Sequence, residues 1–280
     1  METLFLDPFN ILLLAGFIGF FMAFGIGAND VANSMGTSVG SKAITIKQAI
    51  IIAAIFEFLG AFLAGGEVTS TIRKGIVDPN LYANDVNIFV IGMISALLAG
   101  GTWLFIASLR GWPVSTTHSI VGAIIGFVLI SKGVDAVSWG KVGNIAMSWV
   151  TSPLFSGTLA FGLYISAKKL ILDRANPGKA AITFIPLYSF LVAVVISLVT
   201  ARKGLKHVGI EFSENEIYLF TLIFSIIVAT GTAFFLRRNK DQIMREGGIE
   251  FAFGLLMIVS ASAMAFAHGS NDVANAIGPL

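Results

Sequence analysis

Two copies of one polar pentapeptide are the residues of this chain best suited to chemistry. Asn-Asp-Val-Ala-Asn occurs at 29–33 and again at 271–275, each time beside long apolar sequence. An Asp at mid-helix costs roughly 2.5–3.5 kcal/mol on membrane-insertion scales, so its presence twice needs a reason. Asp and Asn oxygens form a hard oxygen site for a small cation. We therefore expect cation binding at Asp30 and Asp272, with hydrogen bonding between helices as the alternative.

The local geometry of the first copy depends on whether it is helical. In a helix, Asn29 and Asn33 are four residues apart and share a face, with Asp30 beside them. Gly27 and Gly36 flank the motif and permit local unwinding, which would free backbone carbonyls as further ligands.

A second polar element consists of Ser115, Thr116, Thr117 and His118, which follow Pro113 at the start of an apolar run. Pro in a first turn with hydroxyls around it favours a helix N-terminus. Such an end offers unpaired N–H groups and a positive dipole, which suit an anion. The alternatives are an ordinary N-cap at a membrane boundary and, for the histidine, a structural role.

The acidic groups need neutralisation if an anion binds near them. Glu57 lies inside the apolar run 50–64 without a basic residue within a turn, so it is protonated, paired with a cation or facing water. A neutral Glu that donates between helices is the alternative. No Lys or Arg lies mid-span, Arg110 being at an edge. The site chemistry favours cation-coupled anion uptake; a pure cation pathway leaves the hydroxyl-rich element unexplained.

The elements that position these residues are predicted to be transmembrane helices. Of the 280 residues, 56% are hydrophobic and only 12% are charged. Continuous rather than alternating apolar runs exclude spanning strands, so we expect an all-α polytopic membrane protein. The net charge of +2 gives no support to nucleic-acid binding. The absence of cysteine excludes thiolate chemistry. The sequence contains neither a Walker motif nor a dinucleotide-binding glycine motif, so we expect no organic cofactor.

Eight apolar segments bounded by charged or turn residues are long enough to be spans. They cover residues 9–28, 46–65, 86–109, 112–131, 142–167, 182–200, 217–236 and 249–267. The segment 112–131 opens with Gly-Trp-Pro, and 142–167 is interrupted by Thr151-Ser152-Pro153. We expect re-entrant or broken helices at these two places, where irregular backbone would line a cavity.

Lys and Arg in the loops favour an external N-terminus. With that orientation, eleven of the 18 basic residues lie in internal segments and seven in external ones. The span before the first pentapeptide then runs inwards and the span before the second runs outwards. This opposed topology is the inverted-repeat arrangement of many secondary transporters.

The repeat is long enough to be significant. Met22–Asn33 and Met264–Asn275 agree at nine of twelve positions without a gap. We assign residues 1–179 to the first transmembrane repeat, 180–248 to connecting helices and loops, and 249–280 to the start of an inverted second repeat. A full second repeat does not fit, so its C-terminal part is expected beyond Leu280 or on another polypeptide.

The two pentapeptides and the segment Pro113–His118 resemble the inorganic phosphate transporter (PiT) family. The resemblance runs from the first motif to the end of the chain. It implies symport of inorganic phosphate with sodium or, in other members, protons through an inverted-repeat bundle in the lipid bilayer. Some members use metal-phosphate complexes, and relatives transport sulfate. A homo-oligomer and a plasma-membrane location are compatible with it.

The resemblance also implies roles for particular residues. The residues expected to bind phosphate are Ser115, Thr116, Thr117, Asn29, Asn33, Asn271 and Asn275. Those expected to bind the co-transported sodium are Asp30, Asp272, Asn29 and Asn271. Glu57 matches a second-span glutamate that is important in the family, and we group it with His118 as coupling or proton-linked. Family members carry a second Ser-Thr-Thr-His element, which these 280 residues lack.

Three functional hypotheses follow. The first is a sodium-coupled phosphate symporter, and the second is a proton-coupled phosphate or sulfate permease of the same architecture. The third, from a different class, is an intramembrane hydrolase that uses Asp30, Glu57 and His118 as acid, base or metal ligands. No motif places a nucleophile beside a base, so the sequence predicts a transporter and not an enzyme.

Overall fold

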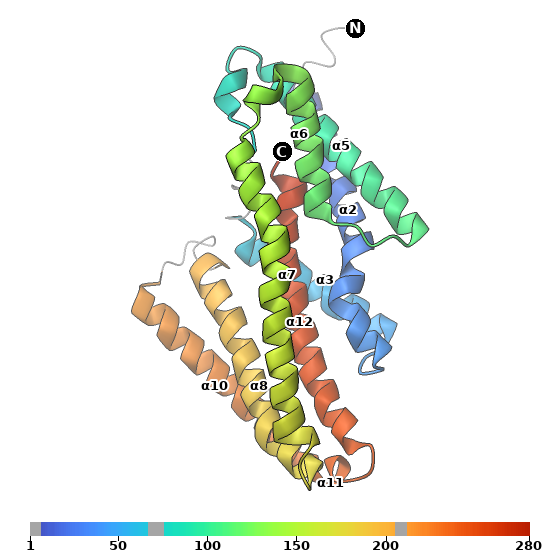
Figure 1. Cartoon of the computed structure of the whole chain (residues 1–280), viewed down its shortest axis with the longest axis vertical. Helices are drawn as coiled ribbons and strands as arrows, with labels where there is room; N and C mark the ends of the chain where they lie inside the picture. The colour runs from blue at the N-terminus through green and yellow to red at the C-terminus, as the bar shows by residue number, and fades with distance from the viewer. Residues whose placement is uncertain (1–6, 67–75, 205–211) are drawn as a thin grey trace. The chain divides into compact units, whose positions relative to one another are not determined.

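The structure is a computed structural model that describes residues 7–66, 76–204 and 212–280 (Figure 1). These residues are almost entirely helical, and their one strand-like feature is an isolated antiparallel bridge between Val77 and Val137. The long helices are α2 (Pro8–Gly40), α3 (Ile46–Ala64), α5 (Val86–Arg110), α6 (Thr116–Lys132), α7 (Trp139–Ala167), α8 (Pro177–Val199), α10 (Glu214–Arg238) and α12 (Gly248–Ile277). The short ones are η1 (Pro79–Tyr82), η2 (Val134–Ala136), η3 (Lys168–Leu172), η4 (Thr200–Gly204) and α11 (Lys240–Ile243).

Seven of the described helices are long and apolar enough to cross a membrane, where the sequence predicted eight. The exception is α6, whose 17 residues are fewer than the roughly 20 that a crossing needs. It begins at Thr116 and not near 112, because Pro113 lies before the N-cap and outside the helix. A re-entrant or broken helix was expected at residues 112–131, and the short length of α6 agrees with that expectation.

The predicted interruption at Thr151-Ser152-Pro153 is wrong. Helix α7 is continuous from Trp139 to Ala167 with Pro153 inside it. A proline removes one backbone N–H from a helix, here the one that would bond the carbonyl of Trp149, and nearby hydroxyls add hydrogen bonds to other carbonyls of the same turns. Here the Thr151 hydroxyl donates to the carbonyl of Met147, and the Ser156 hydroxyl donates to the carbonyl of Pro153.

The local unwinding expected at Gly27 and Gly36 is also absent. Helix α2 is continuous over 33 residues and contains the whole first pentapeptide. The second pentapeptide lies inside α12, which continues to Ile277. Neither motif is unwound, and the contacts of the site described below are made by side chains rather than by freed backbone carbonyls.

The chain divides into two compact units. The first comprises the chain up to Asn33, the segment Gly65–Ile145 and the end of the chain from His268. The second comprises Ser34–Ala64 and Ala146–Ala267. The two motif helices thus contribute to both units, and both pentapeptides belong to the first.

The first unit is held together by close packing of α2 against α5 and α6. Its apolar core includes Met22, Leu97, Leu104 and Ile120, which are fully buried. A Cβ atom at Gly101 would lie 2.9 Å from the ring of Phe21, a contact that requires rearrangement. Glycine at this point allows the backbones of α2 and α5 to approach each other, as small residues do in membrane bundles.

The second unit has a core of its own around α8 and α10. Ile171, Ile185, Leu236 and Ile243 are fully buried there. The hydroxyls of Ser166 and Tyr188 lie 2.7 Å apart and join α7 to α8. Close packing of apolar side chains together with hydrogen bonds between helices is how membrane helix bundles are stabilised.

Large apolar side chains cover much of the protein's exposed surface. Phe17 is 72% exposed, Ile130 is 91% exposed and Phe155 is 78% exposed. In water this would be an aggregation-prone surface, but in a bilayer these side chains face acyl chains. Seven apolar helices with this surface describe an integral membrane protein.

Candidate functional site

Three ionisable side chains gather in the first unit, close to the middle of the two pentapeptides. Asp30 from α2 meets His268 and Asp272 from α12, and ligand atoms from the three lie within 4.8 Å of one another. The Nε2 atom of His268 is 2.6 Å from Oδ2 of Asp272 and 3.8 Å from Oδ2 of Asp30. Asp30 is 5% exposed and Asp272 8%. Carboxylates buried to this extent require a partner cation or proton.

The two copies run in opposite directions in this unit. Asp30 lies near His268, whereas Gly19, eleven residues earlier on α2, lies against Leu280 at the end of the chain. Contacts that move backwards along one helix as they move forwards along the other define an antiparallel pair. This directly supports the inverted topology that the loop charges predicted for the two copies.

Asn275 connects the carboxylates to the hydroxyl-rich element. Its Nδ2 atom lies 3.1 Å from Oδ1 of Asp272 and 3.3 Å from each of the hydroxyl oxygens of Thr116 and Thr117. The side-chain amide has only two hydrogens for these three acceptors. Asn275 is 1% exposed and Thr116 is 3% exposed. The acidic cluster and the start of α6 therefore form one continuous polar site.

The start of α6 has the predicted form of a helix N-terminus. Ser115 is the N-cap, and its hydroxyl accepts from the backbone N–H of His118 at 3.2 Å. The N-cap alternative for this serine is thus confirmed as a structural role. The first-turn N–H groups of Thr116 and Thr117 have no partner within the helix by its geometry. They supply donors and the positive end of a helix dipole beside Asn275.

Asn29 holds the loop that leads into α6. Its Nδ2 atom donates to the carbonyl of Trp112 at 3.0 Å and to the hydroxyl of Ser108 at 3.3 Å. Its Oδ1 atom accepts from the backbone N–H of Val114 at 3.3 Å. Both amide hydrogens are engaged. Asn29 therefore ties α2 to the end of α5 and to the loop before the Ser115 N-cap.

The remaining predicted site residues have different surroundings. Asn33 and Asn271 are exposed on their helices. His118 is exposed and lines a separate cavity of about 270 Å³ with Trp103 and Ser119. Glu57 belongs to the second unit, where its side chain on α3 is half-buried. The structure therefore brings together some of the predicted set and leaves the roles of these four as predictions.

Two residues of the site were missed by sequence reasoning. His268 aligns with Ile26 of the first copy. It is one of the positions at which the two copies differ, so the repeat gave no reason to select it. Its spacing of four residues from Asp272 could have identified it, because such a pair shares a helix face. Ser108 had no local signal, because it contacts Asn29 only through the packing of α5 against α2.

Asp30 carries an atom suited to an incoming cation. Its Oδ1 atom is buried without a hydrogen-bond partner among the described residues. Leaving a buried oxygen of this kind unmatched is costly, and a bound cation removes the cost. Two carboxylates and a further oxygen from Asn275 or a threonine would provide hard ligands for sodium. The residue types gathered at the site are thus those that the twin motifs predicted for a cation.

The fold and the site together define a class: a polytopic helical membrane protein with two antiparallel copies of one polar motif at a buried site, as in inverted-repeat transporters. The comparison with protein families is specific. Residues 26–280 match the model of the phosphate transporter family, and the chain belongs to that family.

Individual relatives agree with this assignment. A Haemophilus influenzae protein provisionally named a phosphate permease is 52% identical over 269 residues, covering 94% of this chain and 63% of the relative. The Arabidopsis thaliana protein named "Inorganic phosphate transporter 2-1, chloroplastic" is 40% identical over 295 residues, covering 94% of this chain and 48% of its own. The family and these relatives are named as transporters and permeases, not as enzymes, which answers the hydrolase hypothesis.

A solved structure named "The sodium-dependent phosphate transporter" has the same fold. Its TM-score is 0.89 with 39% sequence identity, and the match covers 96% of this chain and 66% of that one. The predicted all-α membrane fold is thereby confirmed. The present chain spans just under two thirds of the length of the bacterial relative and of this structure.

Proposed function

We propose that the protein imports inorganic phosphate by cation-coupled secondary transport and that the coupling ion is sodium. The observation that carries this proposal is that Asn275 contacts both the acidic cluster and the hydroxyls at the start of α6. On one side are the buried carboxylates of Asp30 and Asp272, and on the other are the hydroxyls and first-turn N–H groups of α6. A cation site and an anion site that share one side chain favour coupled binding.

The charges require the cation to bind with the anion. An anion about 4 Å from an uncompensated carboxylate is repelled by about 4 kcal/mol at the effective dielectric of a partly buried site. Sodium at Asp30 and Asp272 removes this repulsion, so phosphate affinity depends on sodium. The buried Oδ1 atom of Asp30 supports sodium binding at this position because it has no other partner among the described residues.

Phosphate is bound by neutral donors in this proposal. The hydroxyls of Thr116 and Thr117 and the first-turn N–H groups donate to phosphate oxygens. Asn275 orients the two threonines, and Asn29 fixes the loop that begins α6. Ser115 caps the helix through its hydroxyl oxygen, and its O–H is the donor that would contact a phosphate oxygen.

The other half of the cradle follows from symmetry. Asn29 meets the loop before α6 and Asn275 meets its threonines. Under the inverted repeat, the equivalents of these residues are Asn271 and Asn33, which are exposed here. We propose that a second Ser-Thr-Thr-His element, as the family resemblance implies, contacts these two asparagines. Glu57 and His118 are assigned to coupling on the same resemblance.

A proton-coupled phosphate or sulfate permease is the second candidate. One observation favours it: His268 lies 2.6 Å from the carboxylate of Asp272, so a titratable imidazole is part of the polar site. Histidine is the side chain whose charge changes most readily near neutral pH. In this alternative a proton replaces sodium as the neutralising charge.

Uptake by proteoliposomes containing the full-length protein separates the two candidates. Labelled phosphate is supplied with sodium or with choline in its place at one fixed pH. Sodium coupling predicts loss of uptake in choline, while undiminished uptake would show that sodium is not the coupling ion. Labelled sulfate in the same vesicles tests the substrate. We also propose a plasma-membrane location with the N-terminus outside, which accessibility labelling of single-cysteine variants in cells would test.

A further inference from the structure

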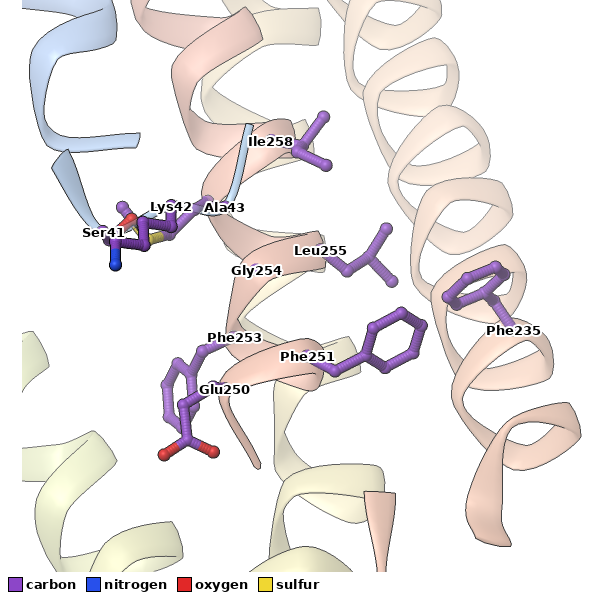
Figure 2. A pocket seen from close by; sticks show the side chains of 11 residues that line it. Ser41, Lys42, Ala43, Phe235, Glu250, Phe251, Phe253, Gly254, Leu255 and Ile258 are labelled. Carbon is purple, nitrogen blue, oxygen red and sulfur yellow. Dashed lines mark hydrogen bonds between the residues drawn. The ribbon is translucent and has the colours of Figure 1, made fainter. Parts of the chain in front are cut away.

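A cavity of about 540 Å³ lies in the second unit, away from the residues used above (Figure 2). It crosses one face of α12 near the beginning of that helix. One side is bounded by the loop between α2 and α3, at Ser41–Ala43, and the other by Phe235 of α10. Both the loop and the beginning of α12 are at the ends of spanning helices, the level at which lipid headgroups lie.

The cavity has a polar side and an apolar side. Figure 2 shows Lys42 and Glu250 on one side of α12, with Phe251 and Leu255 directed to the other side, towards Phe235. Gly254 lies between the two sides. Because glycine has no side chain, the part of the cavity next to the loop stays open at this position. Its nearest neighbour would be Ala43, whose Cβ is 3.8 Å from a Cβ built on Gly254.

The apolar side chains of the cavity form a stripe along the axis of α12, the direction in which the acyl chain of a lipid would lie. Phe251, Leu255 and Ile258 follow one another at helical spacing along α12. Seven residues of helix cover about 10 Å along the axis, from the helix start into the apolar region. A lipid tail lying along this stripe would bury apolar surface on both α12 and α10.

Lys42 is held at the rim in an unusual backbone conformation. Its φ of 62° makes it the one described non-glycine residue with positive φ. The backbone N–H of Ala43 donates to the carbonyl of Ser38, and that of Lys42 donates to Val39, which is the glycine-favouring C-terminal cap of a helix. A lysine here is strained relative to glycine, which makes its side chain a candidate for a role at the rim.

The charges at the rim select the headgroup. Lys42 offers an ammonium and Glu250 a carboxylate, and the two do not form an ion pair with each other or with other described residues. Glu250 lies in the first turn of α12. A phosphate therefore fits beside Lys42 and an ammonium beside Glu250.

We propose that this cavity binds one phosphatidylethanolamine molecule, with its phosphate at Lys42, its ammonium at Glu250 and an acyl chain across Gly254 towards Phe235. The Ser41 hydroxyl donates to Sδ of Met257 at 3.2 Å and already holds the loop against α12. The lipid strengthens this contact between the loop after α2 and the start of α12.

The test is lipid binding by the purified full chain, delipidated in detergent and measured by native mass spectrometry. Phosphatidylethanolamine, phosphatidylcholine and phosphatidylglycerol with identical acyl chains are titrated separately. Phosphatidylethanolamine is expected to bind most tightly. Lys42→Gln should weaken its binding about fivefold, the contribution of one lysine near a lipid surface. Lys47→Gln, outside the cavity on α3, is the matched control and should bind as the parent chain does.

Two glycine variants separate binding from folding. Lys42→Gly relieves the positive φ, so its melting temperature without lipid should equal or exceed that of the parent chain while lipid affinity falls. Gly254→Leu fills the middle of the cavity and should remove the lipid-induced rise in melting temperature. Gly231→Leu on α10, where a Cβ meets nothing within 4 Å, should retain that rise.

Two results would overturn the proposal. The first is tighter binding of phosphatidylglycerol than of phosphatidylethanolamine, which would mean that Glu250 does not contact the headgroup. The second is equal lipid binding by the parent chain and by Gly254→Leu. Neither result depends on transport, so failure here is distinct from failure of the proposed symport.

Discussion

The two Asn-Asp-Val-Ala-Asn copies have one sequence but opposite burial of their asparagines. In the first copy Asn29 is half-buried and bonded while Asn33 is exposed. In the second, Asn271 is exposed while Asn275 is buried and bonded. Both aspartates are buried. The buried central carboxylate is therefore common to both copies. Which flanking asparagine forms hydrogen bonds differs between them, because the two copies have different neighbours.

The difference has a physical origin in α5 and α6. One pair of helices serves two antiparallel motif helices, so the loop before α6 meets the first asparagine of α2 and its threonines meet the last asparagine of α12. The first copy thus holds the loop before α6 through Asn29, and the second orients the threonine hydroxyls of α6 through Asn275. Substitutions that treat the two copies unequally will test this division.

The largest effect is expected from the shared element. Asp30→Asn and Asp272→Asn should each lower sodium-dependent phosphate uptake by about 100-fold or more, because removing one buried charge from an ionic cluster costs at least about 3 kcal/mol. Uptake of labelled phosphate by proteoliposomes measures the loss. Asp85→Asn is the control, since that carboxylate pairs with Lys132 at an exposed position. Unchanged uptake in the Asp30 and Asp272 variants would mean that these side chains only pack helices.

The second comparison is between equivalent asparagines. Asn275→Ala should destabilise the chain by about 2 kcal/mol, because the Thr116 hydroxyl and Oδ1 of Asp272 lose the buried amide that donates to them. In residues 1–280, where Asn33 is exposed, Asn33→Ala should change stability by less than about 0.5 kcal/mol. Denaturation of the two variants in detergent measures the difference. Equal losses would contradict the asymmetry and indicate that Asn33 is packed as closely as Asn275.

The third prediction removes the main sequence difference between the copies. His268→Ile gives the second copy the residue that Ile26 supplies to the first. The sodium concentration for half-maximal uptake should rise about tenfold, since the imidazole lies 2.6 Å from Oδ2 of Asp272 and groups that orient a ligating carboxylate contribute about 10–100-fold to metal affinity. Ile26→Val is the control and should leave sodium dependence unchanged. An unaltered sodium dependence in His268→Ile would exclude a role for the imidazole in arranging Asp272.

The smallest effect is expected at the loop. Asn29→Asp retains an acceptor for Val114 but loses both donors, so the KM for phosphate should rise about fivefold with little change in maximal rate. Ser108→Ala removes one weak contact and should change KM less. A fall in maximal rate with unchanged KM would show instead that Asn29 acts in the conformational steps of transport.

Much of the site was accessible from sequence because its signals are local. The pentapeptides, the hydroxyl element and the missing mid-span cations are all read from residue types and spacing. The opposed direction of the two copies followed from basic residues in the loops, and the contacts of Gly19 and Asp30 agree with it. Helix continuity was harder to predict. Gly27, Gly36 and Pro153 permit a break, but surrounding packing and hydroxyls decide whether one occurs.

The sequence by itself determined that this is a helical membrane protein of the phosphate transporter family with a doubled acidic motif, because run length, composition and repeats are properties of the chain alone. Only the tertiary structure decided which asparagines are buried and that His268 joins the aspartates. Those outcomes depend on residues 159 and 238 positions apart, such as Thr116 with Asn275 and Asp30 with His268. Helix packing creates such neighbours, and no local pattern encodes them.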